Sequence, residues 1–188
     1  MTKAKSIISW TIIFLLFIVA VGQGYLLWHA EYGNDLDIRP YYGPIPKELQ
    51  VICYYKIDYT DMRTLVEKEL DTIYRYSNKE SEIPEYADGS ANWFLRTVYM
   101  RPLDKYDNEY QYGAVLAHEL VHIKYVTKDE QWTTFKTITL LLESESKVLR
   151  EVGKYYALSI LTMYNSLEYG MYLYEYDVGA YIVEYFNK

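Results

Sequence analysis

The hydrophobic pattern differs between three parts of the chain. Residues 7–28 form one run that has no charge and no polar face. Residues 50–57 and 93–100 are short apolar segments, which predict strands. Apolar residues at helical spacing predict helices over residues 61–76, 108–126, 128–153 and onward to about residue 174. The expected fold class is α+β, with a small sheet followed by helices.

The uncharged run predicts a membrane anchor. Its 22 residues would form a helix about 33 Å long at about 1.5 Å per residue, enough to cross a bilayer core. Lys3 and Lys5 precede the run, so the positive-inside bias places the N-terminus in the cytoplasm and the rest of the chain outside it. Secretion after signal cleavage is the alternative, because Ala20 and Gly22 form a weak small-residue site.

Four parts follow from this pattern. Residues 1–6 are expected to be a cytoplasmic tail and residues 7–28 a transmembrane signal anchor. Residues 29–49 hold three of the five prolines and predict a Pro/Gly-rich tether. Residues 50–188 are expected to form the folded domain.

Composition narrows the function classes. The net charge of −7 provides no basic face for a phosphate backbone, so we expect no nucleic-acid partner. Cys53 is the single cysteine, which excludes an internal disulfide and a cysteine-based zinc site. Only three histidines are present, at positions 29, 118 and 122.

Two of these histidines belong to the motif His-Glu-Leu-Val-His at residues 118–122. Two capping boxes, Asn108 with Gln111 and Thr127 with Glu130, place this motif inside one helix and begin the next. The spacing puts both imidazoles on one helix face, where they can hold one Zn²⁺.

The glutamate within the motif, Glu119, projects in a neighbouring direction. It can therefore take a proton from an attacking water and pass it to a leaving amine. The motif thus predicts zinc-dependent hydrolysis of peptide bonds, with His118 and His122 as metal ligands and Glu119 as the general base.

The motif resembles that of the zincin metallopeptidases, in which a third protein ligand completes the site. His29 borders the membrane segment, and Lys128 stands six residues after His122, so a third histidine is not expected. The resemblance then implies a carboxylate as third ligand, as in the gluzincin type. The candidates are Glu130, Glu143 and Glu145, which lie 8, 21 and 23 residues after His122.

Residues 118–158 also resemble an uncharacterised family of bacterial membrane-anchored zincin-like proteins. Its members follow the zinc motif with a turn and an E-x-E-A-N-F segment, which Glu130, Thr134 and Phe135 match in frame, with Thr134 in place of the asparagine. This resemblance implies a minimal zincin-like domain and favours Glu130 as the third ligand. Glu143, at a thermolysin-like spacing, and Glu145, within an apolar stripe, stay open as alternatives.

Other parts of a peptidase site are implied in the same way. Zincins use a His or Tyr to stabilise the oxyanion, and Tyr155 or Tyr156 is a candidate here. Substrate commonly pairs with a sheet edge, and residues 94–100 are the candidate strand. Asp177 is a candidate for orienting a ligand histidine.

The sequence is best interpreted as a membrane-tethered zinc metallopeptidase that acts on peptide or protein substrates, an endopeptidase rather than an exopeptidase. Two alternatives belong to other function classes. One is a non-catalytic zincin-like binding module, which would have no need of Glu119. The other is a metal-free anchored interaction protein that binds a partner through its tyrosine-rich surface.

Overall fold

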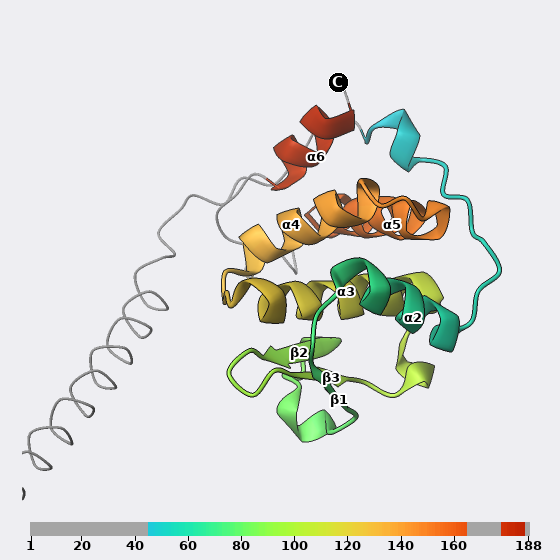
Figure 1. Cartoon of the computed structure of the whole chain (residues 1–188). Helices are drawn as coiled ribbons and strands as arrows, with labels where there is room; N and C mark the ends of the chain where they lie inside the picture. Colours follow the sequence, from blue (N-terminus) through green and yellow to red (C-terminus); the bar gives the residue numbers. More distant parts are fainter. Residues whose placement is uncertain (1–44, 165–177, 187–188) are drawn as a thin grey trace, which may run out of the picture. The chain divides into compact units, whose positions relative to one another are not determined.

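The computed structural model describes residues 45–164 and 178–186 (Figure 1). The described part contains the α-helices α2 (Tyr59–Leu70), α3 (Glu109–Tyr125), α4 (Glu130–Leu142), α5 (Lys147–Tyr164) and α6 (Val178–Phe186). The strands are β1 (Arg75–Ser77), β2 (Gly89–Asn92) and β3 (Thr97–Met100). Short 3₁₀ turns are η1 (Lys47–Leu49), η2 (Glu80–Glu82) and η3 (Leu103–Lys105). The predicted α+β class is confirmed.

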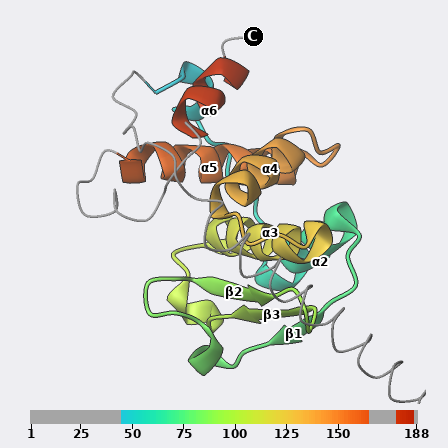
Figure 2. The ribbon, with the colours of Figure 1, turned by 90° about the vertical axis from the view of Figure 1, so that its left-hand side faces the viewer.

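The three strands form one mixed sheet in the order β1-β3-β2. β1 runs parallel to β3, with Tyr76 opposite Val98, and β2 runs antiparallel to β3, with Ala91 opposite Val98. β3 is therefore the central strand, and β2 is an edge. Figures 1 and 2 show α2 and α3 beside this sheet, with α4 and α5 on the other side of α3.

Helix α3 lies at the centre of this arrangement and is apolar on nearly every side. Leu116, Leu120 and Val121 are fully buried in a core shared with α2, β3 and α5. A second core joins η1, α4, α5 and α6, and contains Leu49 and Ile182. Residues 45–49, which the sequence assigns to the tether, thus include a side chain that packs on the helices.

The helix predicted over residues 108–126 is confirmed. The Asn108 side chain caps it by accepting hydrogen bonds from the backbone N–H groups of Tyr110 and Gln111, at 3.0 and 2.9 Å. The return bond of the capping box is displaced by one residue, because the Gln111 side chain accepts from the N–H of Asp107 at 2.6 Å. This cap fixes where α3 begins and so where the motif lies along it.

The strand predicted over residues 50–57 is wrong. Its backbone donors bond to side chains instead of to a neighbouring strand: Cys53 N–H to Glu151 at 2.9 Å, and Tyr55 N–H to the Tyr110 hydroxyl at 2.7 Å. With those donors satisfied, the segment crosses the helices as irregular backbone. The strand predicted over residues 93–100 is confirmed only for Thr97–Met100, since residues 93–96 form the turn from β2 to β3.

The predicted helix boundaries also change. The helix expected over residues 61–76 ends at Leu70, where Asp71 takes a left-handed conformation. The helix expected over residues 128–153 is two helices, α4 and α5, separated at residues 143–146. Helix α4 begins at Glu130 behind the N-cap Asp129, not behind Thr127.

The anchor predicted at residues 7–28, the expected helix beyond residue 164 and Asp177 lie outside the described residues. In the part of the chain that the structure describes, no helix is long and apolar enough to cross a membrane.

Candidate metal centre

Three side chains converge between α3 and the start of α4. The Nε2 atoms of His118 and His122 are 3.1 Å apart. Glu130 Oε2 lies 3.0 Å from the first of these nitrogens and 3.3 Å from the second. Among the described residues, these three form a group able to hold a metal ion.

The local fold explains how they meet. The two histidines are one turn apart on α3, so their rings project from the same face. Val126 then ends α3 in a left-handed conformation, with φ 53°. The side chain of Asp129 caps α4 by accepting from the N–H groups of Gln131 and Trp132, so Glu130 becomes the first residue of that helix. The chain therefore reverses within four residues and returns a carboxylate to the histidines.

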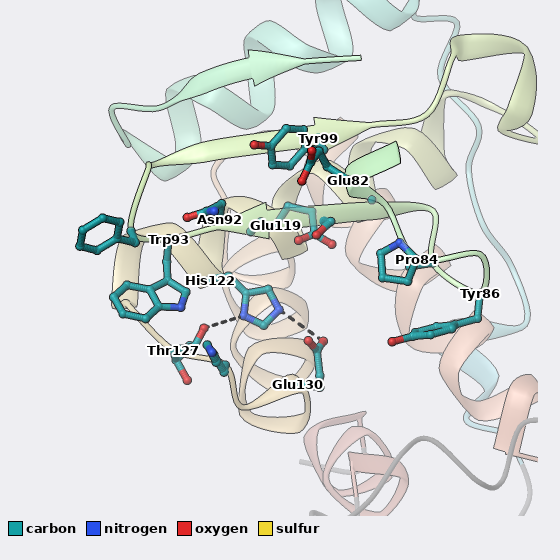
Figure 3. Close-up of a pocket in the computed structure, with 16 residues that line it drawn as sticks. Glu82, Pro84, Tyr86, Asn92, Trp93, Tyr99, Glu119, His122, Thr127 and Glu130 are labelled. Carbon is teal, nitrogen blue, oxygen red and sulfur yellow. Dashed lines mark hydrogen bonds and ion pairs between the residues drawn. The ribbon is translucent and has the colours of Figure 1, made fainter. Parts of the chain in front are cut away.

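Both histidines are held through their second ring nitrogen. His122 Nδ1 lies 2.8 Å from the carbonyl oxygen of Thr127 (Figure 3). A carbonyl only accepts, so Nδ1 carries the proton and donates it, which leaves the Nε2 lone pair for a ligand. His118 Nδ1 lies 2.9 Å from the hydroxyl of Tyr156 on α5, which is able to accept the Nδ1 proton and so leave Nε2 for a ligand.

The distances among the three donor atoms match a tetrahedral ion. Zn²⁺ binds imidazole nitrogen and carboxylate oxygen at about 2.0–2.2 Å, and donors at tetrahedral angles are then about 3.3–3.6 Å from one another. The observed separations of 3.0, 3.1 and 3.3 Å lie at or just below the lower end of that range. Two imidazoles and one carboxylate are a donor set suited to zinc, so the residues fit the ion.

The electrostatics of the cluster favour a cation. Burial disfavours the charged forms of Glu130 and His122, but the hydrogen bond between the two side chains favours these forms more strongly. The pKa of Glu130 is lowered by the two histidines, and the pKa of His122 is raised by Glu130. The carboxylate therefore stays ionised and attracts positive charge, whether a proton or a metal ion.

Glu119 lies beside the cluster and points toward the sheet (Figure 3). It is only 8% exposed, and burial raises its pKa, an effect that the two histidines partly offset. Gly89 of β2 makes room for it: a Cβ there would lie 3.1 Å from Glu119 Cγ and 2.8 Å from Val115 Cγ1. The absence of a side chain at position 89 lets α3 approach the edge strand closely.

A cleft of about 630 Å³ runs past these residues. Glu119, His122 and Glu130 line it together with residues of β2, the turn after β2 and the loop before β2. The candidate substrate strand, residues 94–100, is corrected here. Its strand portion, β3, is central and already paired on both sides, whereas β2 has its outer edge toward the cleft.

The structure separates the three candidate carboxylates. Glu130 joins the histidines, while Glu143 and Glu145 are exposed in the connection between α4 and α5 and are not part of the cluster. Glu145 does not belong to the apolar stripe that the sequence predicts, because the helix breaks at residues 143–146.

Two further residues of the site could not be assigned from the sequence. Thr127 contributes a main-chain carbonyl, which leaves no signal in a sequence. Gly89 belongs to an Asp-Gly pair that indicates a turn and gives no sign of close contact with a helix.

Tyr156, a candidate for oxyanion stabilisation, contacts the far side of the His118 ring instead. Tyr155 stacks its ring edge against Tyr110, with centroids 6.3 Å apart.

Comparison with protein-family models, with curated proteins and with solved structures finds no match to this chain. The function proposed below therefore rests on the geometry of the site and on the motif itself.

Proposed function

We propose that this chain is a zinc-dependent peptidase with a zincin-like domain. His118, His122 and Glu130 are the metal ligands, and Glu119 is the general base. One observation carries the proposal: three donor atoms meet at tetrahedral spacing while both histidines are held by hydrogen bonds through Nδ1. A coincidental pair of histidines has no reason to show that orientation.

Zn²⁺ held by these residues would supply Lewis-acid chemistry, which activates water and polarises a peptide carbonyl at neutral pH. Glu119 accepts a proton from the attacking water, whose oxygen bonds to the carbonyl carbon. The carbon–nitrogen bond then breaks, and Glu119 delivers the proton to the leaving nitrogen. The buried position of Glu119 between α3 and β2 holds its carboxylate on the cleft side of the helix.

The edge of β2 supports a polypeptide as substrate. Ser90, Ala91 and Asn92 line the cleft, so their outward backbone groups can pair with an extended chain. Main-chain pairing of this kind recognises a peptide without requiring its terminus, which favours an endopeptidase.

The uncharged run at residues 7–28 extends the proposal to location. We place the N-terminus in the cytoplasm and the peptidase domain on the other side of one membrane, to which residues 7–28 anchor it. Release of the domain after signal cleavage is the alternative. A blot of membrane and soluble fractions, with an epitope at the C-terminus, distinguishes the two by partition and by size.

Zinc content tests the metal site. The full chain is purified in detergent, exposed to Zn²⁺ and washed, and the metal per chain is measured by mass spectrometry. We expect about one zinc in the wild type and almost none in His122→Ala. Glu130→Gln should lose most of the metal, while Glu143→Gln and Glu145→Gln, which change the rejected carboxylates, should keep it. A folded wild type that takes up no zinc refutes the site and favours the metal-free interaction protein.

Peptide cleavage tests the role of Glu119. Glu119→Gln should keep its zinc and lose cleavage of a casein digest by a factor of about 100 or more. Persistent cleavage in this variant overturns the assignment of Glu119. Zinc-loaded wild type that cleaves no peptide supports the non-catalytic binding module.

A further inference from the structure

We infer that the cleft selects extended peptides that carry large apolar side chains, aromatic ones above all, next to the bond that is cleaved. This inference rests on the proposed peptidase function and adds the class of substrate. Aromatic side chains stand on both sides of the metal cluster. Figure 3 shows Trp93 beside His122 and Thr127 on one side, and Pro84 and Tyr86 on the other.

The aromatic residues present their surface to the cleft. Phe94 is 80% exposed and Tyr86 is 75% exposed, although both are large and both line the cavity. Trp93 and Phe94 meet edge to face with ring centroids 6.3 Å apart, so they form one continuous aromatic surface. Exposed aromatic residues gathered in a concave site are typical of binding surfaces, because covering them with an apolar group releases water.

Charge in the cleft gives no competing basis for selection. Three glutamates line it: Glu130 contacts the two histidines, Glu82 is paired with Lys79, and Glu119 is only 8% exposed. Lys128, in the turn between α3 and α4, is the single lysine or arginine among the described residues that line the cavity. The carboxylates of the described lining are thus each paired or buried, so apolar contact is the favoured interaction.

The wall that carries Tyr86 is held in place from behind. Arg101 donates to the carbonyl oxygens of Ala87, Pro84 and Glu85, at 2.8, 3.1 and 3.0 Å. The hydroxyl of Tyr106 donates to the carbonyl of Asp88 at 2.8 Å. Four of the five carbonyl oxygens of residues 84–88 are thus hydrogen-bonded. The loop therefore loses little conformational entropy when a ligand binds, which favours binding at this surface.

The preference can be measured by binding and by cleavage. The probes are fluorescein-labelled decapeptides of Ala, Ser and Gly with one central residue, which is Phe, Leu, Glu or Lys. Binding is followed by anisotropy with zinc-loaded, full-length Glu119→Gln in detergent, where no cleavage interferes. Cleavage is followed with the wild type as kcat/KM. We expect the Phe peptide to exceed the Glu and Lys peptides by about tenfold or more in both measurements.

Variants of the β2–β3 turn provide the control. Phe94→Ala alone and together with Trp93→Ala should remove most of the preference for Phe. Leu95→Ala, which changes the next side chain of the same turn but not a residue that lines the cleft, should leave the preference unchanged. Equal binding and cleavage of all four peptides, or a preference that survives loss of Trp93 and Phe94, overturns the inference while the peptidase stands. Selective binding without cleavage by the wild type overturns the peptidase and leaves the apolar cleft.

Discussion

Tyr156 offers the most direct test of how the site is built. Its hydroxyl is 2.9 Å from His118 Nδ1, and His118 is 9% exposed. Replacing Tyr156 with Phe removes the hydroxyl and keeps the ring, so packing against the His118 ring is retained. The change leaves Nδ1 of a nearly buried imidazole without that hydrogen-bond partner.

The size of the effect follows from the cost of an unmatched polar group. A buried donor that loses its partner costs about 1–3 kcal/mol, and about 1.4 kcal/mol corresponds to a factor of ten in an equilibrium constant. Measured losses for groups that orient metal-bound histidines are about 10- to 100-fold in metal affinity. We expect the dissociation constant for zinc to rise by about 10- to 100-fold in Tyr156→Phe.

The assay is competition between the full chain and a chromophoric zinc chelator. Tyr155→Phe is the matched control, since it removes a hydroxyl from the neighbouring position of α5, where the ring contacts Tyr110 and not the metal cluster. Co²⁺ can replace Zn²⁺ to report ligand geometry by visible absorption, which a change in packing elsewhere would not move. Zinc affinity in Tyr156→Phe within twofold of that in Tyr155→Phe would refute the assigned role.

Contacts elsewhere in the structure lead to three other predictions. Gly89→Ala should lower the free energy of unfolding, measured by urea titration, by about 1–3 kcal/mol, because the added Cβ would lie 2.8 Å from Val115 Cγ1. An unchanged urea midpoint would contradict the close approach of α3 and β2. Arg101→Met should speed hydrogen exchange in residues 84–88 by about tenfold or more, since three carbonyl bonds are lost; protection equal to the wild type would show that Arg101 does not hold the loop. In zinc-free protein, the His122–Glu130 pair should contribute most to the free energy of unfolding between pH 4.5 and 6.5. The pKa of Glu130 is lowered by folding, so its contribution is lost when acid protonates the carboxylate. The pKa of His122 is raised by folding, so its contribution is lost when alkali deprotonates the imidazole. Comparing urea unfolding of the wild type and His122→Gln across pH checks this, and a difference that grows steadily above pH 8 would contradict it.

The parts of the site that are local in sequence could be predicted. A helix with a polar N-cap at Asn108 and a two-histidine motif at one-turn spacing follows from short-range rules, and the structure places that helix where the pattern does. The resemblance favours Glu130, whereas helix phase, which assumes one long helix over residues 128–153, does not decide between the three carboxylates. The connection at residues 143–146 changes that phase, and nothing in the local pattern marks it: Ser144 there bonds to Glu69, 75 residues away.

The parts that depend on distant segments could not be predicted. Residues 50–57 have the composition of a strand, yet a strand needs a partner, and the side chains of Tyr110 and Glu151 take the bonds that a partner would take. The edge strand β2 has the short sequence Gly-Ser-Ala-Asn, which lacks the β-branched and aromatic residues that mark strands. Its pairing with β3 and its closeness to α3, not its own propensity, make it a strand.

The difference between local and distant contacts also separates the proposed metal binding from the proposed catalysis. The three proposed ligands fall within 13 residues, from His118 to Glu130, and one helix, one turn and one capped helix start bring them together. The carboxylate at the first position of α4 also lies at the positive end of that helix, which favours its ionised form. The proposed zinc binding therefore requires little beyond α3, the start of α4 and Tyr156 of α5. The proposed cleavage requires more, because Glu119 faces a cleft whose other side is β2 and the loop held by Arg101. A variant that disturbs the sheet edge, such as Gly89→Ala, should thus lose cleavage before it loses zinc, whereas loss of both together would mean that the sheet is needed to form the metal site itself.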